Sequence, residues 1–267
     1  MTTLPKNRFK QWLSDPAKVP VGTWLMTASP NVAEAIGWAG FDFLVLDMEH
    51  VPVDVPQAIA IMQAVAGTPA ELVVRLPWND PVMVKRVLDS GAQSLMFPYV
   101  QNAEEARRAV RSTRYPGKGS RGVAAVHRAS RYGTVADYLQ RADEELAVIL
   151  QLETPEALAE MASIAAVGDV DALFVGPGDL SAAMGHIGEI RHPEVQAAIA
   201  AAVAESRRLG LPCGIVGAEP GLVGDYRDQG FGFVAVGSDM SLMMSRAKEY
   251  VAALKGQVAE ATDSGVY

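Results

Sequence analysis

Short apolar runs alternate with longer, alanine-rich amphipathic stretches along almost the whole chain. The runs are rich in β-branched residues and have the length of strands, whereas the stretches between them have the length of helices. This alternation favours right-handed crossovers and a parallel sheet. Eight such runs are present, at Gly22–Thr27, Phe43–Asp47, Leu72–Leu76, Ser94–Pro98, Ala147–Leu152, Ala172–Gly176, Cys213–Val216 and Phe233–Gly237. Eight units predict an α/β fold of the closed (β/α)8 TIM-barrel type.

An open, doubly wound sheet is the alternative that this alternation leaves. Its commonest signature is a glycine-rich dinucleotide fingerprint after the first strand, and Thr27–Pro30 has none. Capping residues followed by proline predict helix starts at Ser29-Pro30, Asp80-Pro81 and Thr154-Pro155. Glycines placed ahead of the following strands predict the helix ends, at Gly40, Gly67, Gly91, Gly168, Gly210 and Gly230.

The chain is expected to form a single domain over 1–267, with its core at about 20–255. A short helix near Arg8–Ser14 is predicted ahead of the barrel. It would cover the floor, which is the end of the barrel where the strands begin. The segment 114–146 is longer than a usual connection and is expected to become helical from about Val135; connections of this length are often functional. Residues 259–267 are expected to be frayed. No shift in composition divides the chain.

Composition narrows the class of protein. Hydrophobic residues make up 49% of the chain, which is enough for a large core, and the net charge is −8. The acidic balance argues against a nucleic-acid partner, because no basic stripe is present to neutralise phosphates. Cys213 is the only cysteine, which excludes an internal disulfide. The start of the chain has no apolar leader and no run reaches the length of a membrane helix, so a cytoplasmic location is expected.

Ionisable residues gather where four of the predicted strands end. In a barrel, the carboxyl ends of the strands carry the chemistry, so these side chains should meet at one mouth. Burying several charges near one axis is costly without a ligand. Taken one at a time, each could instead be a loop charge or a helix cap. The six residues concerned are Asp47, Glu49, His50, Arg75, Glu153 and Asp179.

Two carboxylates on neighbouring strands, Glu153 and Asp179, suit a hard divalent cation such as Mg²⁺, Mn²⁺ or Co²⁺. No cysteine–histidine cluster favours zinc. An acid–base pair of the glycosidase type is the alternative. His50 is the natural proton-transfer group, and Asp89 on the third predicted helix could orient it. None of the seven lysines lies in a predicted strand, so a Schiff-base mechanism is not expected, and no nucleotide cofactor is signalled.

Four blocks of sequence together resemble the HpcH/HpaI family of class II pyruvate aldolases. They are Leu46–His50, Val74–Asp80, Gln151–Thr154 and Phe174–Ser181, and the resemblance extends from about Gly22 to Met244. It is nearest to members that act on 4-hydroxy-2-oxoheptanedioate and 2-keto-3-deoxy sugar acids. The resemblance implies metal-dependent, reversible cleavage of a 4-hydroxy-2-oxo acid to pyruvate and an aldehyde.

The resemblance also implies a role for each site residue. Glu153 and Asp179 would bind the metal ion, and Gln151 with the backbone at Gly178 and Asp179 would hold the pyruvyl group. His50, supported by Asp89, would be the base. Arg75 would stabilise the enolate, with Asp47 and Glu49 behind it. Substitution of Gly178 by alanine is expected to be mild.

The resemblance further implies a hexamer built as a trimer of dimers that exchange their last helix, about Met240–Leu254. The apolar stripe on that helix could equally pack on its own barrel. Two other functions stay open: a related metal-dependent lyase for a CoA thioester or phosphonate, and a catalytically idle barrel. The aldehyde is not specified by the sequence; its possible contacts in the long segment are Arg121, His127, Arg128 and Arg131.

Overall fold

Eight parallel strands form a closed barrel in which each strand pairs with the next in chain order and β8 closes on β1. The computed structural model describes residues 3–256. The predicted barrel is confirmed, and every predicted strand boundary lies within two residues of the observed one. The strands are β1 Val21–Leu25, β2 Phe43–Asp47, β3 Glu71–Arg75, β4 Ser94–Phe97, β5 Ala147–Leu152, β6 Ala172–Val175, β7 Cys213–Gly217 and β8 Phe233–Ser238.

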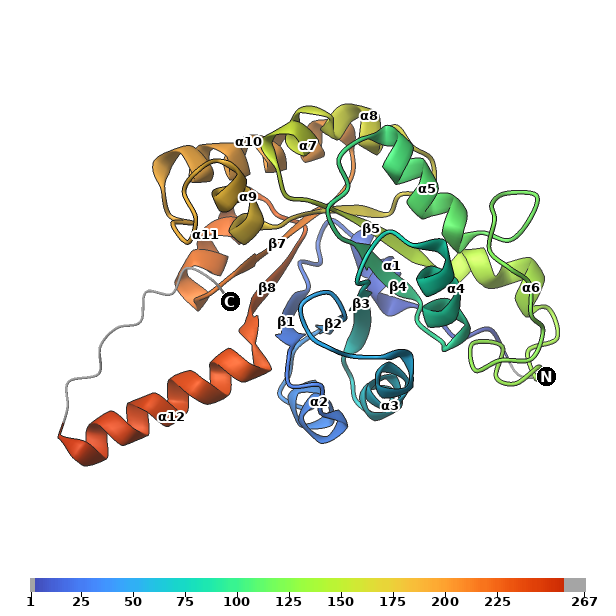
Figure 1. The fold of residues 1–267 in the computed structure, drawn as a ribbon, viewed down its shortest axis with the longest axis horizontal. Coiled ribbons are helices and arrows are strands. Elements are labelled where there is room, and N and C mark those ends of the chain that lie inside the picture. The colour runs from blue at the N-terminus through green and yellow to red at the C-terminus, as the bar shows by residue number, and fades with distance from the viewer. Residues whose placement is uncertain (1–2, 257–267) are drawn as a thin grey trace.

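Helices surround the barrel (Figure 1). The predicted caps are confirmed: the side chains of Ser29, Asp80 and Thr154 each accept a backbone N–H three residues on, and a proline begins each helix. The helices are α1 Arg8–Leu13, α2 Pro30–Gly37, α3 Val55–Val65, α4 Pro81–Asp89, α5 Ala103–Thr113, α6 Tyr138–Arg141, α7 Pro155–Ala159, α8 Met161–Ala165, α9 Pro177–Ala183, α10 Pro193–Leu209, α11 Pro220–Gln229 and α12 Asp239–Lys255, with a 3₁₀ helix η1 at Ala142–Glu145.

Aromatic side chains fill the inside of the barrel. Phe43, Phe174 and Phe233 are buried and in ring contact with one another or with Trp24. Phe9 of α1 packs on this group, with ring centroids 5.0 Å from Phe43 and 5.5 Å from Phe233. The short first helix therefore covers the barrel floor, as predicted, and leaves the opposite end for a site.

The single cysteine lies at the start of β7. Cys213 is buried, and burial raises the pKa of its thiol to about 12. A thiol in such surroundings stays protonated and unreactive in the folded protein.

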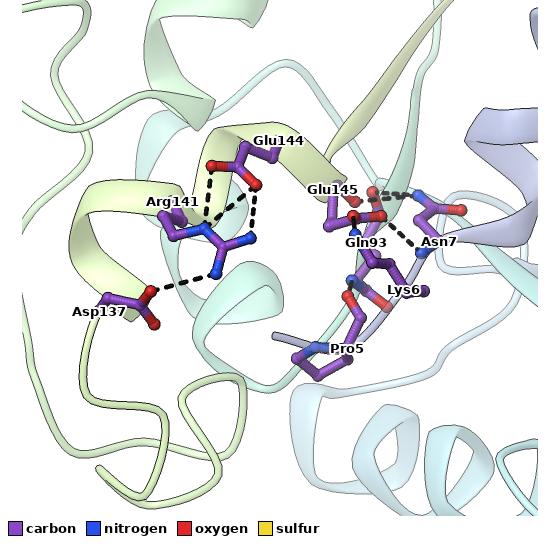
Figure 2. A network of polar contacts seen from close by, with 8 residues as sticks. All are labelled: Pro5, Lys6, Asn7, Gln93, Asp137, Arg141, Glu144 and Glu145. Carbon is purple, nitrogen blue, oxygen red and sulfur yellow. Dashed lines mark hydrogen bonds and ion pairs between the residues drawn. The ribbon is translucent and has the colours of Figure 1, made fainter. Parts of the chain in front are cut away.

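Polar contacts tie the N-terminal segment to the end of the long connection (Figure 2). Asn7 is buried; its backbone N–H donates to Glu145 Oε2 at 2.8 Å, and its Nδ2 donates to Gln93 O at 3.1 Å. Lys6 Nζ lies 2.7 Å from Glu145 Oε1, and Gln93 Nε2 donates to Pro5 O at 2.8 Å. These contacts hold α1 and η1 at the floor, so the second half of the long segment packs at that end of the barrel and not at the mouth.

The last helix, α12, projects away from the barrel (Figure 1). It begins at a Ser238 cap and its apolar residues Met243, Tyr250 and Val251 are between 48% and 57% exposed. Packing on its own barrel, one of the two interpretations of the stripe, is therefore not what the structure shows. The predicted frayed end at 259–267 lies outside the described residues. Within 3–256, no helix is long and apolar enough to cross a membrane.

Candidate active site

The carboxyl ends of β2 and β3 place an arginine against an aspartate inside the barrel. Asp47 and Arg75 are register partners in the β2–β3 pairing, and both are fully buried. Arg75 Nε and Nη2 donate to the two oxygens of Asp47 at 3.0 and 2.8 Å. The guanidinium also lies over the ring of Trp24, at 4.2 Å from its centroid. This two-point contact fixes the plane of the guanidinium before any substrate arrives.

The same aspartate shapes the turn that follows β2. Asp47 Oδ1 accepts the backbone N–H groups of Glu49 at 2.9 Å and His50 at 3.3 Å. Glu49 Oε2 lies 3.1 Å from Arg75 Nη1 and 3.9 Å from His50 Nε2. Burial raises the pKa of Glu49, and the charge of Arg75 opposes that rise. The side chain of His50 is 52% exposed, so it stands at the mouth, open to a ligand.

Glu153 follows β5 and is the most strongly perturbed carboxyl group of the mouth. It is buried; its Oε1 accepts from Gln151 Nε2 at 2.7 Å and its Oε2 from the Tyr99 backbone N–H at 2.8 Å. Burial, with the negative charges of Asp179 and Glu49, raises its pKa to about 8. The hydrogen bond from the Tyr99 N–H and, to a smaller extent, the charge of Arg75 only partly offset these effects.

Asp179 lies in the first turn of α9, directly after β6, and its charge acts on Glu153. Two glycines precede it with different constraints. A Cβ added at Gly176 would stand 2.6 Å from Glu153 Oε1, whereas a Cβ at Gly178 would meet no heavy atom within 4 Å. Gly176 is thus required for the position of Glu153, while the open space at Gly178 supports the expectation that alanine is mild there.

The donor set fits a divalent cation. Glu153 and Asp179 offer carboxylate oxygens, and their mutual repulsion contributes to the raised pKa of Glu153. Gln151 Oε1 is buried and has no hydrogen-bond partner within the described part of the chain. A hard cation with open coordination positions would relieve the repulsion, because it brings a positive charge that these oxygens can bind.

Within the single chain, Asp89 contacts the long segment, and the support that it was predicted to give His50 stays a prediction. It ends α4, and α4 runs back from the carboxyl end of β3, so Asp89 lies toward the opposite end of the barrel. There its Oδ1 accepts from Arg121 Nη2 at 2.7 Å and lies 3.7 Å from His127 Nε2. The contact with Arg121 could not be predicted, because nothing in the sequence indicates that the long segment folds back against the end of α4.

The charged residues of the long segment are likewise held near the end of α4. Arg121 is buried and lies over the ring of Tyr115, 4.6 Å from its centroid. Arg128 Nη1 donates to Ser90 O at 2.8 Å. Within one chain, these residues are therefore not brought to the mouth that holds Glu153.

The sequence analysis missed two contributions at the rim. The backbone of Tyr99 holds Glu153, and Tyr99 has a φ of 53°, a conformation that is uncommon outside glycine. Its ring is stacked on Trp78, with centroids 6.2 Å apart, and both side chains are exposed. The proline before Tyr99 signals a turn, but nothing in the sequence indicates the hydrogen bond or the stack.

Comparisons with known proteins agree with one another. The profile of the family described as HpcH/HpaI aldolase/citrate lyase matches residues 21–245. The chain is 54% identical to a 2-dehydro-3,6-dideoxy-6-sulfogluconate aldolase of Pseudomonas putida, over 90% of this chain and 94% of the relative. It is 46% identical to a 4-hydroxy-2-oxo-heptane-1,7-dioate aldolase of Escherichia coli, over 98% of this chain and 100% of the relative. A crystal structure of an HpcH/HpaI aldolase/citrate lyase family protein from Burkholderia cenocepacia superposes with a TM-score of 0.91 at 39% identity, covering 94% of this chain and 100% of that one.

Proposed function

The chain belongs to the HpcH/HpaI aldolase/citrate lyase family, and from this premise we propose that it is a divalent-metal-dependent aldolase. It cleaves a 4-hydroxy-2-oxo acid reversibly to pyruvate and an aldehyde, and is thus a carbon–carbon lyase. The observation that carries the proposal is the pair Glu153 and Asp179 at the mouth, where burial and like charge raise the pKa of Glu153 to about 8. A bound cation stabilises such a pair, whereas without a cation the two negative charges repel each other.

The two protein ligands of the ion would be Glu153 and Asp179, with Mg²⁺, Mn²⁺ or Co²⁺ as suitable ions. When bound, the ion would withdraw electron density from the C2 oxygen of the substrate and so stabilise an enolate. Gln151 and the backbone at Gly178 and Asp179 would hold the pyruvyl carboxylate and keto oxygen. The partnerless Oε1 of Gln151 supports this assignment, because a buried amide is expected to be satisfied when its ligand is present.

Proton transfer falls to His50, whose exposed ring stands at the mouth beside Glu49. In cleavage, His50 removes the proton of the C4 hydroxyl, the C3–C4 bond breaks, and its electron pair passes to the C2 oxygen as the enolate forms. The aldehyde leaves, and protonation at C3 gives pyruvate. Arg75 places a fixed positive charge near the developing oxyanion, and Asp47 and Glu49 keep it in position.

Assembly is part of the proposal, because α12 leaves its apolar stripe without cover in the single chain. A hexamer built from dimers that exchange α12 would bury it. Light scattering should give the mass of six chains for the wild type and a smaller species for a Met243→Asp, Val251→Asp variant. A wild-type monomer in solution would refute the assembly without touching the proposed reaction.

The reaction is tested with a panel of 4-hydroxy-2-oxo acids, following pyruvate with a coupled dehydrogenase. The panel includes a seven-carbon dicarboxylate and a sulfonated sugar acid, which are the substrates in the names of the two relatives. We expect turnover that a chelator abolishes and Mn²⁺ restores. Turnover that is insensitive to chelator would exclude the metal mechanism, and no turnover across the panel would exclude the aldolase.

Two variants test the assigned roles. Glu153→Ala should lose metal binding, whereas His50→Ala should keep it and lose turnover. Retained turnover in either variant contradicts the role given to that residue.

A further inference from the structure

Two histidines that sequence alone leaves without a role meet in the connection between α9 and α10. His186 and His192 flank this connection, and Glu189 lies midway between them. One ligand atom from each of the three lies within 4.8 Å of those of the other two. Because the connection runs outside the barrel, after α9, the cluster is separate from the strand ends that hold Glu153.

The backbone holds the three side chains in place. The N–H of Glu189 donates to His186 O at 2.9 Å, and the N–H of His192 donates to Glu189 O at 2.8 Å. Two consecutive β-turns, each closed by an N–H donated to the carbonyl three residues earlier, therefore bring the three side chains together. Ile190 between them is buried, and its carbonyl accepts from Gln196 Nε2 at 2.8 Å. The cluster is built on an anchored turn rather than on a loose loop.

Hydrogen bonds select the nitrogen that each ring can offer. His186 Nε2 lies 3.0 Å from Glu194 Oε2, and a carboxylate there holds the proton on Nε2. Nδ1 of His186 then carries the free lone pair, which is the arrangement by which an outer carboxylate orients a metal-binding imidazole. His192 Nδ1 accepts the N–H of Glu194 at 3.3 Å and so caps α10. That hydrogen bond is long, so little hydrogen-bond energy is lost if His192 binds a ligand instead.

The rings themselves are unusually close. Their centroids are 3.5 Å apart with an angle of 16° between the planes, and Glu189 supplies a carboxylate beside them. Two imidazoles and a carboxylate are ligands that Zn²⁺ and its transition-metal neighbours prefer, whereas Mg²⁺ prefers oxygen alone. The lone pairs lie in the planes of these stacked rings, so the two imidazoles would have to leave the stack and turn toward each other to bind one ion.

We propose that His186, Glu189 and His192 bind one Zn²⁺ ion at a second metal site, distinct in position and in ligand chemistry from the oxygen site at the barrel mouth. Glu194 orients His186 from outside the site. Three protein ligands leave room for water to complete the coordination.

The test uses the full-length, untagged and metal-stripped protein. Cu²⁺ serves as the spectroscopic probe, because coupling to imidazole nitrogen in electron paramagnetic resonance separates this site from an all-oxygen one. Zn²⁺ affinity is measured by competition with a chromogenic chelator. The chain has only four histidines, so each nitrogen signal can be assigned.

The variants are His186→Ala and His192→Asn, the latter because asparagine keeps a helix cap but offers no imidazole. Each should weaken Zn²⁺ binding by more than about tenfold, since losing a ligand costs at least as much as losing an outer partner. Each should also lose the nitrogen coupling of one imidazole while pyruvate release in Mn²⁺ stays at the wild-type rate. The matched control, His50→Ala, should keep both the Zn²⁺ affinity and the coupling.

The proposal is overturned if the two variants bind Zn²⁺ as tightly as the wild type. It is also overturned if the nitrogen coupling disappears in His50→Ala instead. Circular dichroism confirms that each variant is folded before its affinity is compared.

Discussion

The raised pKa of Glu153 predicts how the stability of the metal-free protein changes with pH. In the unfolded chain this carboxyl group titrates near its ordinary value of 4.5, whereas burial and like charge raise its pKa to about 8 in the folded chain. Between these values the folded protein binds a proton that the unfolded chain has lost. The free energy of unfolding therefore falls as the pH rises through this window.

The size of the effect follows from the two pKa values. Their separation corresponds to about 5 kcal/mol as an upper bound, at about 1.4 kcal/mol for each pKa unit. Entry of water and rotation of the side chain reduce this, so we expect about 2 to 5 kcal/mol. For a chain of this length the change amounts to a shift in melting temperature on the order of 10 °C.

The perturbation is Glu153→Gln, which removes the titration and keeps most of the shape. Its carbonyl can accept the Tyr99 N–H, and its amide can donate to Gln151 Oε1 if Gln151 turns over its own amide. In chelator, the variant should become more stable than the wild type as the pH rises from about 5 to 8.5.

Melting temperatures are measured at fixed protein concentration, because oligomer formation would otherwise shift them. Added Mn²⁺ should stabilise the wild type at pH 8 and leave the variant unchanged. If the two proteins show parallel pH profiles in chelator, the argument from burial and like charge is wrong.

Four further substitutions test other contacts. Gly176→Ala should lower metal affinity and turnover by more than about tenfold, because the new methyl group displaces Glu153. Gly178→Ala should change both quantities by no more than about twofold, because its methyl group meets no other atom. Equal effects of the two substitutions in metal titration and pyruvate release would contradict the packing argument. Arg75→Lys should reduce kcat by more than about tenfold, because lysine cannot make the two-point contact with its aspartate partner, and a wild-type rate in the coupled assay would refute this. Phe9→Ala should lower the free energy of unfolding by about 3 kcal/mol, because it opens a cavity in the barrel floor, and it should leave kcat unchanged. If denaturant unfolding shows no loss of stability, the ring of Phe9 does not seal the floor.

The barrel could be predicted because its strands and helices are marked locally. Apolar runs of strand length gave the strands, and a capping residue before proline gave the starts at Ser29, Asp80 and Thr154. In a closed barrel, consecutive strands are neighbours, so chain order also indicates which strand ends meet. This is why Glu153 and Asp179 could be expected at one mouth.

Contacts set by the path of the long connection could not be predicted. Asp89 pairs with Arg121 within the single chain, because the segment after α5 folds back to meet the end of α4. The meeting of His186 with His192 depends on two successive turns whose hydrogen bonds leave no mark in the apolar pattern. Both cases are governed by loop geometry, which has no periodic signal.

The single buried thiol gives the folded state a built-in reporter. Cys213 begins β7, between β6 and β8, and its thiol stays protonated in the closed barrel. An alkylating reagent can reach it only when these strands separate, so the rate of modification measures how often the barrel opens. The same shielding means that mild oxidants should leave this thiol reduced, and that thiol-reactive labels can be attached at engineered surface cysteines without first removing the native one.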